Sequence, residues 1–344
     1  MKVGFFSNQL SLRGTEEVMY SYADYNETVL NNTSVIISFP LKTETKDTTK
    51  ESYERFEKRF ETFYITDEER IIQYQLDTLV VKEKIDVLYI AKWGIINNTI
   101  TSKCPTIVHA VFKMCQPHGD VYVGVSEYVA TQAGFPPTQC LPNIVRPCSI
   151  TTSLRYQLRI PEDALVIGRH GGYDTFNIEY VKQYIIEFAT THPSVHFVFL
   201  NTERFIESPN VHFLPGTVDP ISKKMFINTC DVMIHARDCG ESFGVSCAEF
   251  SIYNKPVITC LCGDTAHIDI LRKRGGLCTG TTCFVYKHET ELEEIFEFLL
   301  TPEGREYIKT PHIFSGYVPF TPERIMPVFE ILLHKAIEVY NKKC

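Results

Sequence analysis

The chain has 344 residues, of which 44% are hydrophobic and 22% are charged. This is the balance of a folded globular protein, and the length suits two domains of ordinary size. The formal net charge of -8 gives no indication of the basic face that a nucleic-acid-binding protein normally has, although a local basic site for a phosphorylated small molecule stays open. No apolar run is long enough to cross a bilayer.

The N-terminal half alternates short apolar runs with helical periodicity, a pattern typical of α/β proteins with mainly parallel sheets. Lys2–Phe6 is predicted to be a buried first strand and not a signal peptide, because polar residues follow it so soon. Further strands are predicted at Ser34–Phe39, Val87–Ile90, Thr106–Ala110 and Val121–Val125. Helices are predicted at Thr15–Ala23, at Asp67–Lys84 and from about Glu127. The charged segment Lys42–Arg59 is expected to form a mobile loop with a short helix.

A change of composition between Phe135 and Thr152 marks a candidate domain boundary, because four prolines fall within it. A second α/β series follows. Its strands are predicted at Leu165–Arg169, His196–Leu200, Val211–Leu214, Val232–His235 and Pro256–Cys260. Its helices are predicted at Ile178–Thr191, Pro220–Thr229, Gly244–Ile252 and Glu289–Leu300, and a long amphipathic helix at about Pro322–Asn341.

The twelve cysteines form no C-x-x-C pair and no close His/Cys cluster. Cys260 and Cys262 form a C-x-C, which is weak evidence for a metal. We therefore expect no metal site, and a cytoplasmic protein whose thiols stay reduced.

The most informative segment is His235–Glu249, which begins at the end of a strand and runs into a helix. Gly240 and Gly244 let the backbone of its loop approach a ligand closely. The N–H groups at the start of the helix form an anion site suited to a diphosphate, and the candidate donor-binding residues there are Ser242, Phe243, Gly244 and Val245.

Two glutamates bracket this anion site. Glu241 lies in the loop and faces the crevice at the carboxyl end of the strand. Glu249 lies in the first turns of the helix and leans back toward its N-terminus, where a carboxylate could accept hydrogen bonds from a ribose diol. The alternative is a surface glutamate and a helix-capping one.

A second strand, in Val166–Asn177, ends in a glycine-rich turn that a helix follows. Arg169 lies in this turn, and its planar guanidinium suits a phosphate. The alternative is an ordinary surface arginine at a strand end. Because the turn is not G-x-G-x-x-G, a nicotinamide-dependent dehydrogenase is not indicated.

Three further places are candidates by their position at strand ends. His109 closes a buried strand, although a lone histidine there is more often structural. Gly14 follows the first strand, where an ordinary turn capped by Thr15 is the alternative. Two turns could contact a nucleotide base through their backbone, and they contain the candidates Asn201, Gly216 and Thr217.

The segment Glu241–Glu249 resembles the E-x7-E signature of retaining glycosyltransferases, and its surroundings resemble glycosyltransferase family 4. The following Asn254–Ile258 also resembles the next turn and strand of that family. The resemblance implies that Glu241 contacts the donor sugar, that Glu249 contacts the ribose and that Arg169 pairs with the donor phosphates. It also places the family's active-site histidine at His109, close to the transferred carbon.

The same resemblance implies that the backbone at Gly14 approaches the donor diphosphate and the acceptor. One position departs from the family, because Thr175 stands where many members carry a lysine for the phosphates. The chain also lacks the Asp-x-Asp motif with which the GT-A class holds a divalent metal. We therefore expect protein groups alone to neutralise the diphosphate, with no metal cofactor.

The implied fold is GT-B, with two facing Rossmann-like domains and a C-terminal helix that crosses back onto the first. Residues 1–148 would form the acceptor-side domain, 149–321 the nucleotide-sugar domain and 322–344 the returning helix. The compact size and the cysteine-rich helices also resemble virus-encoded family 4 enzymes of large algal viruses, which would act in the host cytoplasm.

The implied activity is transfer of a hexose, with retention of configuration, to the hydroxyl of a glycan, a glycoprotein or a small molecule. GDP-mannose is the favoured donor, and a UDP-sugar is the alternative. A nucleotide-sugar epimerase and a non-catalytic nucleotide-sugar binder stay open as other functions. The 12% of aromatic residues makes a homodimer plausible.

Overall fold

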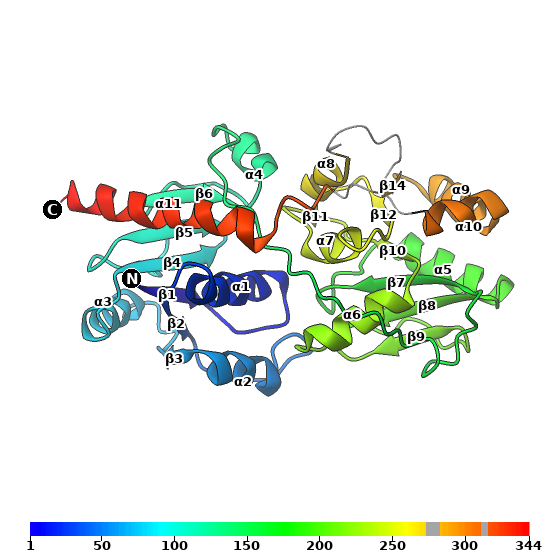
Figure 1. The fold of residues 1–344 in the computed structure, drawn as a ribbon, viewed down its shortest axis with the longest axis horizontal. Helices are drawn as coiled ribbons and strands as arrows, with labels where there is room; N and C mark the ends of the chain where they lie inside the picture. Colours follow the sequence, from blue (N-terminus) through cyan, green and yellow to red (C-terminus); the bar gives the residue numbers. More distant parts are fainter. Residues whose placement is uncertain (273–282, 311–315, 344) are drawn as a thin grey trace. The chain divides into compact units, whose positions relative to one another are not determined.

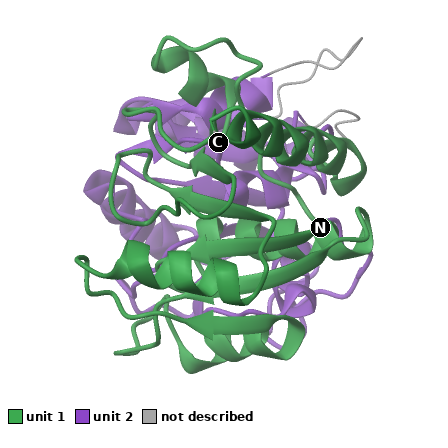
Figure 2. Cartoon of the chain, turned by 90° about the vertical axis from the view of Figure 1, so that its left-hand side faces the viewer, with its two compact units in different colours: residues 1–146, 320–344 green, residues 147–319 purple. Residues whose placement is uncertain are grey.

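A computed structural model describes residues 1–272, 283–310 and 316–343 (Figure 1). The chain divides into two compact units. Unit 1 comprises Met1–Arg146 and Phe320–Cys344, and unit 2 comprises Pro147–Pro319 (Figure 2). The described residues of each unit form a six-stranded sheet in which every strand pair is parallel. The prediction of an α/β fold with parallel sheets is therefore confirmed.

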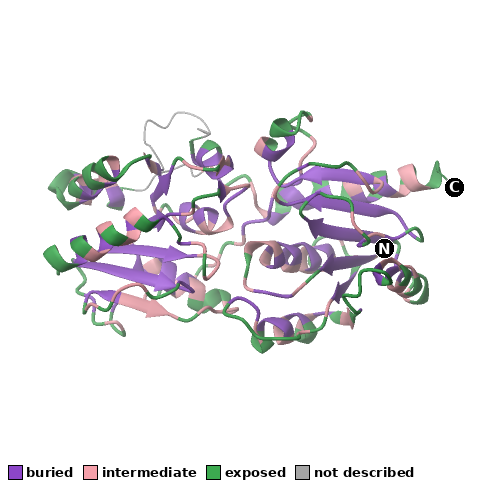
Figure 3. Ribbon diagram, turned by 180° about the vertical axis from the view of Figure 1, so that it is seen from behind, coloured by how far each residue is buried: buried purple, intermediate pink, exposed green. Residues whose placement is uncertain are grey.

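The sheet of unit 1 has the order β3-β2-β1-β4-β5-β6. Its strands are β1 (Lys2–Ser7), β2 (Thr33–Ser38), β3 (Glu61–Tyr64), β4 (Val87–Lys92), β5 (Thr106–Ala110) and β6 (Val121–Gly124). The chain builds outward from β1 to β3 and then returns to add β4 on the other side of β1. Most strand residues are buried, because helices cover both faces of a parallel sheet (Figure 3).

The helices of unit 1 are α1 (Gly14–Thr28), α2 (Lys50–Arg59), α3 (Ile72–Lys82), α4 (Glu127–Gln132) and α11 (Pro322–Asn341). The last of these comes from the far end of the chain. Its Phe329 is fully buried, and its ring lies between 5.1 and 6.1 Å from the rings of Phe5, Tyr22 and Tyr89. Helix α11 therefore completes the core of unit 1, although the whole of unit 2 separates it from the rest of unit 1 in the sequence.

The charged segment Lys42–Arg59 is anchored more firmly than its composition predicts. Helix α2 begins with a capping box between Thr49 and Ser52. Arg59 contacts Glu27 at 2.6 Å and Asp24 at 2.9 Å, so the helix is tied to α1 by ion pairs. Opposite charges spaced along two neighbouring helices thus fix a segment that has few aliphatic residues.

The sheet of unit 2 has the order β14-β12-β10-β7-β8-β9. Its strands are β7 (Leu165–His170), β8 (Val195–Leu200), β9 (Val211–Leu214), β10 (Val232–His235), β12 (Val257–Cys260) and β14 (Cys283–Tyr286). A separate two-stranded ribbon joins β11 (Gly240–Glu241) to β13 (Asp264–Thr265). The helices are α5 (Glu179–Thr191), α6 (Pro220–Thr229), α7 (Val245–Ser251), α8 (Ala266–Arg272), α9 (Glu289–Leu300) and α10 (Pro302–Lys309).

The first turn of α1 holds a carboxyl group inside unit 1. Glu16 is 4% exposed, and it accepts hydrogen bonds from the hydroxyls of Ser7 at 3.0 Å and Ser11 at 2.5 Å. Burial disfavours the charged form and raises the pKa of Glu16 to about 7, although the two hydroxyls and the charge of Arg13 oppose the shift.

This raised pKa predicts a stability that falls as pH rises. Unfolded chains lose the Glu16 proton near pH 4.5, whereas the folded state keeps it until about pH 7. The free energy of unfolding should therefore decline between these values and stay low above them. At 1.36 kcal/mol for each pKa unit, Glu16→Gln should raise it by up to about 3 kcal/mol at pH 8 and leave it unchanged at pH 4.

Urea unfolding of both proteins at pH 4, 6 and 8 measures this difference. Glu68→Gln, which removes an exposed carboxylate in the same unit, is the control and should change the stability little at any pH. Equal curves for the wild type and Glu16→Gln at pH 8 would contradict the prediction.

Candidate functional site

The carboxyl ends of the unit 2 strands bring together candidate residues that are far apart in the sequence. His170 ends β7, Asn201 follows β8, His235 ends β10 and Gly216 follows β9. Because β10, β7, β8 and β9 are consecutive parallel neighbours, these positions share one edge of the sheet. In open α/β sheets this edge is where ligands bind.

Glu241 is fixed by its backbone and through one of its two carboxylate oxygens. Its strand β11 pairs with β13, so that Glu241 lies opposite Thr265. Its Oε1 atom is 3.2 Å from Nε2 of His235 and 3.1 Å from Nη1 of Arg237. The other oxygen, Oε2, has no hydrogen bond to any residue in the described part of the chain. The carboxylate is therefore held in place with one oxygen left for a ligand.

Glu241 is ionised despite its burial. Burial alone would raise its pKa, but the hydrogen bond from His235 and the charge of Arg237 outweigh it and lower the pKa to about 2. A carboxylate can only accept hydrogen bonds. The free Oε2 atom is therefore suited to hydroxyl groups.

Glu249 lies on α7 and is engaged through both oxygens. Its Oε1 atom is 3.0 Å from Nζ of Lys223, and its Oε2 atom is 3.1 Å from Nε2 of His170. Burial would raise the pKa of Glu249, but Lys223 and His170 together outweigh it through charge and hydrogen bonding, and the pKa falls to about 2. Burial lowers the pKa of His170, so this ring is neutral near pH 7. The ammonium group of Lys223 is therefore the positive charge that pairs with Glu249 at this pH.

The contact between Glu249 and His170 is close but poorly aligned. Oε2 of Glu249 and Nε2 of His170 are both buried, and neither has an aligned hydrogen bond to any described residue. Buried polar atoms are nearly always satisfied by protein, water or ligand. This pair is therefore a place where a hydroxyl, which both donates and accepts, would fit chemically.

His170 and Lys223 are site residues that the sequence did not reveal. His170 directly follows Arg169, and its position at the strand end is a signal that could have been used. Lys223 lies on α6, in no motif, and its approach to Glu249 comes only from tertiary packing.

The expected anion site at the start of α7 has an unusual backbone. Gly244 is the N-cap of this seven-residue helix, with φ of 83°, and no described side chain caps it. A Cβ at this position would lie 2.7 Å from Cβ of His267. The preceding Phe243 is buried, and its carbonyl accepts a hydrogen bond from the hydroxyl of Tyr317. Ser242, Phe243 and Gly244 thus lie between Glu241 and the helix, and Val245 is the first residue of the helix.

Arg169 lies inside unit 2 and is 3% exposed. Its Nη1 atom donates to the carbonyl of Asn201 at 3.0 Å, and its Nη2 atom donates to the carbonyl of Gly172 at 2.8 Å and the hydroxyl of Thr175 at 2.6 Å. The residue at the family's lysine position therefore contacts this arginine. Direct contact between Arg169 and a phosphate would require some of these hydrogen bonds to be exchanged.

The turns that were expected to contact a base also lie at this edge. Asn201 has φ of 51°, and its side-chain amide donates to the carbonyl of Gly171 at 2.9 Å. Gly216 and Thr217 are partly exposed in the turn between β9 and α6, where the Thr217 hydroxyl accepts a hydrogen bond from the N–H of Asp219. Polar backbone is thus present in both turns.

His109 and Gly14 belong to unit 1. His109 is fully buried, its Nδ1 atom is 2.5 Å from the Tyr89 hydroxyl, and burial lowers its pKa to about 3. Its Nε2 atom has no hydrogen-bond partner among the described residues. The ring is therefore neutral near pH 7 and without contact with solvent. Gly14 is the first residue of α1 and is partly exposed.

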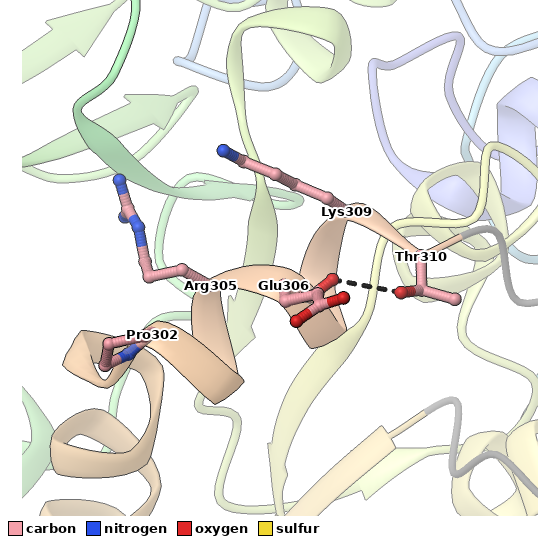
Figure 4. Close-up of a pocket in the computed structure, with 5 residues that line it drawn as sticks. All are labelled: Pro302, Arg305, Glu306, Lys309 and Thr310. Atoms are coloured by element: carbon pink, nitrogen blue, oxygen red, sulfur yellow. Dashed lines mark hydrogen bonds between the residues drawn. The ribbon is translucent and has the colours of Figure 1, made fainter.

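Other ligand sites are less prominent. No group of three or more His, Cys, Asp or Glu side chains in the described residues is placed to hold a metal ion. No described helix has both the length and the apolar character of a membrane span. An open hollow of about 480 Å³ lies on α10, and its described lining is Pro302, Arg305, Glu306, Lys309 and Thr310 (Figure 4). This hollow follows one surface helix and includes none of the residues above.

The backbone at Gly240, directly before Glu241, leaves no room for a side chain. We therefore expect that one added methyl group there lowers the stability strongly. Gly240 has φ of 64°, and a Cβ there would lie 2.1 Å from the carbonyl oxygen of Asp264 in β13. Gly240→Ala should therefore break the ribbon and lower the free energy of unfolding by about 3 kcal/mol or more, measured by urea titration.

Gly134→Ala is the matched control. Gly134 has φ of 79°, and a Cβ there meets no atom within 4 Å. The free energy of unfolding of this variant should fall by only about 1–2 kcal/mol, which is the cost of placing alanine in a left-handed backbone conformation. Equal losses in the two variants would show that the contact with Asp264 is not the constraint.

Three comparisons relate the chain to known proteins. No family model matches the sequence, and no curated protein matches it. Solved structures do match. HepE of Anabaena, determined with UDP and glucose, superposes with a TM-score of 0.66 at 16% identity, over 96% of this chain and 99% of that one. A glycosyltransferase of Rickettsia africae superposes with a TM-score of 0.62 at 12% identity, over 99% and 98%.

A Listeria monocytogenes protein assigned as a UDP-N-acetylglucosamine 2-epimerase is also similar, with a TM-score of 0.60 at 10% identity over 97% of each chain. At such identities the likeness concerns the fold. The chain therefore has the GT-B fold, with two Rossmann-like parallel-sheet domains.

Proposed function

We propose that the protein is a retaining glycosyltransferase of the family 4 type, which transfers a hexose from a nucleotide-diphosphate sugar to an acceptor hydroxyl. The observation that carries the proposal is the pair Glu241 and Glu249. Both are half-buried and ionised. Glu241 precedes the loop that leads into α7, and Glu249 lies within that helix. Their E-x7-E spacing and the GT-B fold support the same activity.

Glu241 is assigned to the donor sugar. Its Oε1 atom is held by His235 and Arg237, whereas Oε2 lacks a described partner. A hexose presents several hydroxyl donors, and an acceptor-only carboxylate selects for them. Hydrogen bonds to such a charged group are worth about 1.5–3 kcal/mol each.

Glu249 and His170 are assigned to the ribose. Oε2 of Glu249 and Nε2 of His170 are 3.1 Å apart and lack aligned partners among the described residues. A ribose hydroxyl could satisfy them by donating to the carboxylate and accepting from the ring.

The diphosphate is assigned to the backbone N–H groups of Gly244 and Val245 and to Arg169. The two N–H groups have no described side-chain cap, and such groups favour anions. As the glycosidic bond loosens toward an oxocarbenium-like state, negative charge grows on the diphosphate, and these donors stabilise it. The acceptor hydroxyl then attacks the face that the diphosphate leaves, so the configuration is retained, and its proton passes to the departing phosphate.

GDP-mannose is the first candidate donor, and it rests on the family 4 resemblance alone. A UDP-sugar is the alternative, and it is supported by the HepE structures determined with UDP and with UDP-glucose. The acceptor class stays open among glycans, glycoproteins and small molecules.

The two glutamates should affect binding differently. Glu241→Gln should weaken binding of the sugar nucleotide by about 10- to 100-fold but leave the free nucleotide diphosphate unaffected, because it loses only sugar contacts. Glu249→Gln should weaken both ligands. Calorimetry without added metal, using GDP-mannose, UDP-glucose, UDP-N-acetylglucosamine, GDP and UDP, measures these affinities.

Glu294→Gln, on the exposed side of α9 in the same unit, is the control and should bind as the wild type does. Binding that both Glu241→Gln and Glu249→Gln leave unchanged would contradict the assignment of the site. Failure of the wild type to bind any of the five ligands would contradict the proposed donor class.

An epimerase is the second candidate, because one of the similar structures is assigned that activity. The two reactions differ in their products. A transferase incubated with the bound donor and a panel of p-nitrophenyl glycosides should release the nucleotide diphosphate and form a linkage with the donor's anomeric configuration, which proton NMR detects. An isomeric sugar nucleotide, formed without release of the diphosphate, would establish the epimerase instead.

A further inference from the structure

Behind Glu241, a chain of three polar side chains runs into the core of unit 2. His235 faces Glu241 through Nε2 at 3.2 Å, and its Nδ1 atom is 3.0 Å from the hydroxyl of Thr259. The same hydroxyl is 2.8 Å from Nε2 of His267. Thr259 and His267 have no exposed surface. The three side chains come from β10, β12 and α8, so the chain joins three separate elements.

The Thr259 hydroxyl restricts the proton arrangement of the two rings. A hydroxyl carries one proton and two acceptor lone pairs, so it can donate to at most one of the two imidazole nitrogens. At least one of the two nitrogens that face it therefore carries a proton and donates to it. The Nε2 atom of His235 faces an ionised carboxylate, so it carries a proton and donates to Oε1 of Glu241. Thr259 thus restrains, through Nδ1, the orientation of the ring whose Nε2 atom holds Glu241.

Other contacts restrain the same ring from the backbone side. The Tyr286 hydroxyl donates to the carbonyl oxygen of His235 at 3.2 Å. The His267 ring lies 4.9 Å from the His235 ring and inclined to it at 54°. None of the described residues forms a hydrogen bond with Oε2 of Glu241. The restraint therefore acts on one oxygen and leaves the other without a hydrogen bond among the described residues.

We propose that His235, Thr259 and His267 are positioning residues, which orient Glu241 so that its Oε2 atom accepts hydrogen bonds from the donor sugar. This inference rests on the proposed function, because it assigns a role toward the same ligand. None of the three touches the reacting atoms, and their effect on sugar binding passes through Glu241. Through Glu241, the three side chains contribute to binding of the sugar and not to binding of the nucleotide that carries it.

The test uses Thr259→Val, which keeps the shape of the side chain and removes the hydroxyl. Two ring nitrogens then lose their partner. Calorimetry should give an affinity for the sugar nucleotide about fivefold weaker than in the wild type, because one net hydrogen bond is lost. Affinity for the free nucleotide diphosphate should be unchanged. Thr259→Ser, which restores the hydroxyl, should recover most of the loss.

Thr229→Val is the matched control for loss of a buried hydroxyl. Thr229 is also fully buried in unit 2, where its hydroxyl donates to the carbonyl of Met225 and accepts from the N–H of Leu154. This variant should lose stability but keep its affinity for the sugar nucleotide. A loss of the same size in both variants would overturn the inference, because it would show a general effect on folding.

A double-mutant cycle separates positioning from a structural role. In the Glu241→Ala background, Thr259→Val should cause no further loss of affinity for the sugar nucleotide, because the residue through which it acts is gone. Additive losses would overturn the inference. Wild-type affinity in Thr259→Val would overturn it too while leaving the proposed function intact, whereas failure of the wild type to bind any sugar nucleotide would overturn both.

Discussion

The parallel direction of the strands is the constraint on which the rest of the structure depends. In each six-stranded sheet the described strands all run the same way, so their carboxyl ends meet at one edge. His170, Asn201 and His235 come from distant parts of the sequence and reach that edge for this reason alone. Parallel strands require long crossover connections, and the helices that make them bury both faces of the sheet. The loops at strand ends are then the main places where polar groups can meet a ligand.

Within this frame the site depends on keeping two half-buried carboxylates charged. Removing a charge from water is costly unless it is paired. Arg237 serves this purpose for Glu241, and Lys223 serves it for Glu249. The histidines beside them add a second contact to each carboxylate, at 3.2 Å from His235 and 3.1 Å from His170. The result is a pair of acceptor groups that each lie beside one cation and one imidazole.

Much of the fold could be predicted because buried parallel strands are nearly continuous apolar runs. The helices α6, α9 and α11 and the strands β5, β9 and β10 have the predicted limits. The strand β3 was not predicted, because it is a short, half-exposed edge strand. The ribbon of β11 and β13 was not predicted either, because strands of two residues are too short to show an alternation of apolar and polar residues.

The site was only partly predictable, because a motif locates residues along the chain but not their partners. The E-x7-E spacing led to Glu241 and Glu249. Their contacts with Arg237, Lys223 and the two histidines depend on how β7, β10 and α6 pack around α7. Likewise, no sequence rule indicated that Thr175 would accept a hydrogen bond from Arg169. The roles assigned to His109 and Gly14 by resemblance stay predictions, and His109 is buried among aromatic rings.

The return of α11 to unit 1 has a consequence for how the chain is made. During synthesis, residues 1–146 emerge first, but Phe5, Tyr22 and Tyr89 lack the ring of Phe329 until residues 322–341 have followed the whole of unit 2. Contacts between such distant segments form slowly, because the entropy cost of closing a long loop comes before the contacts can stabilise the fold. Unit 2 is continuous in sequence and can complete its core on the ribosome. Of the two units, unit 1 is therefore the one whose translation begins first and whose core is completed last.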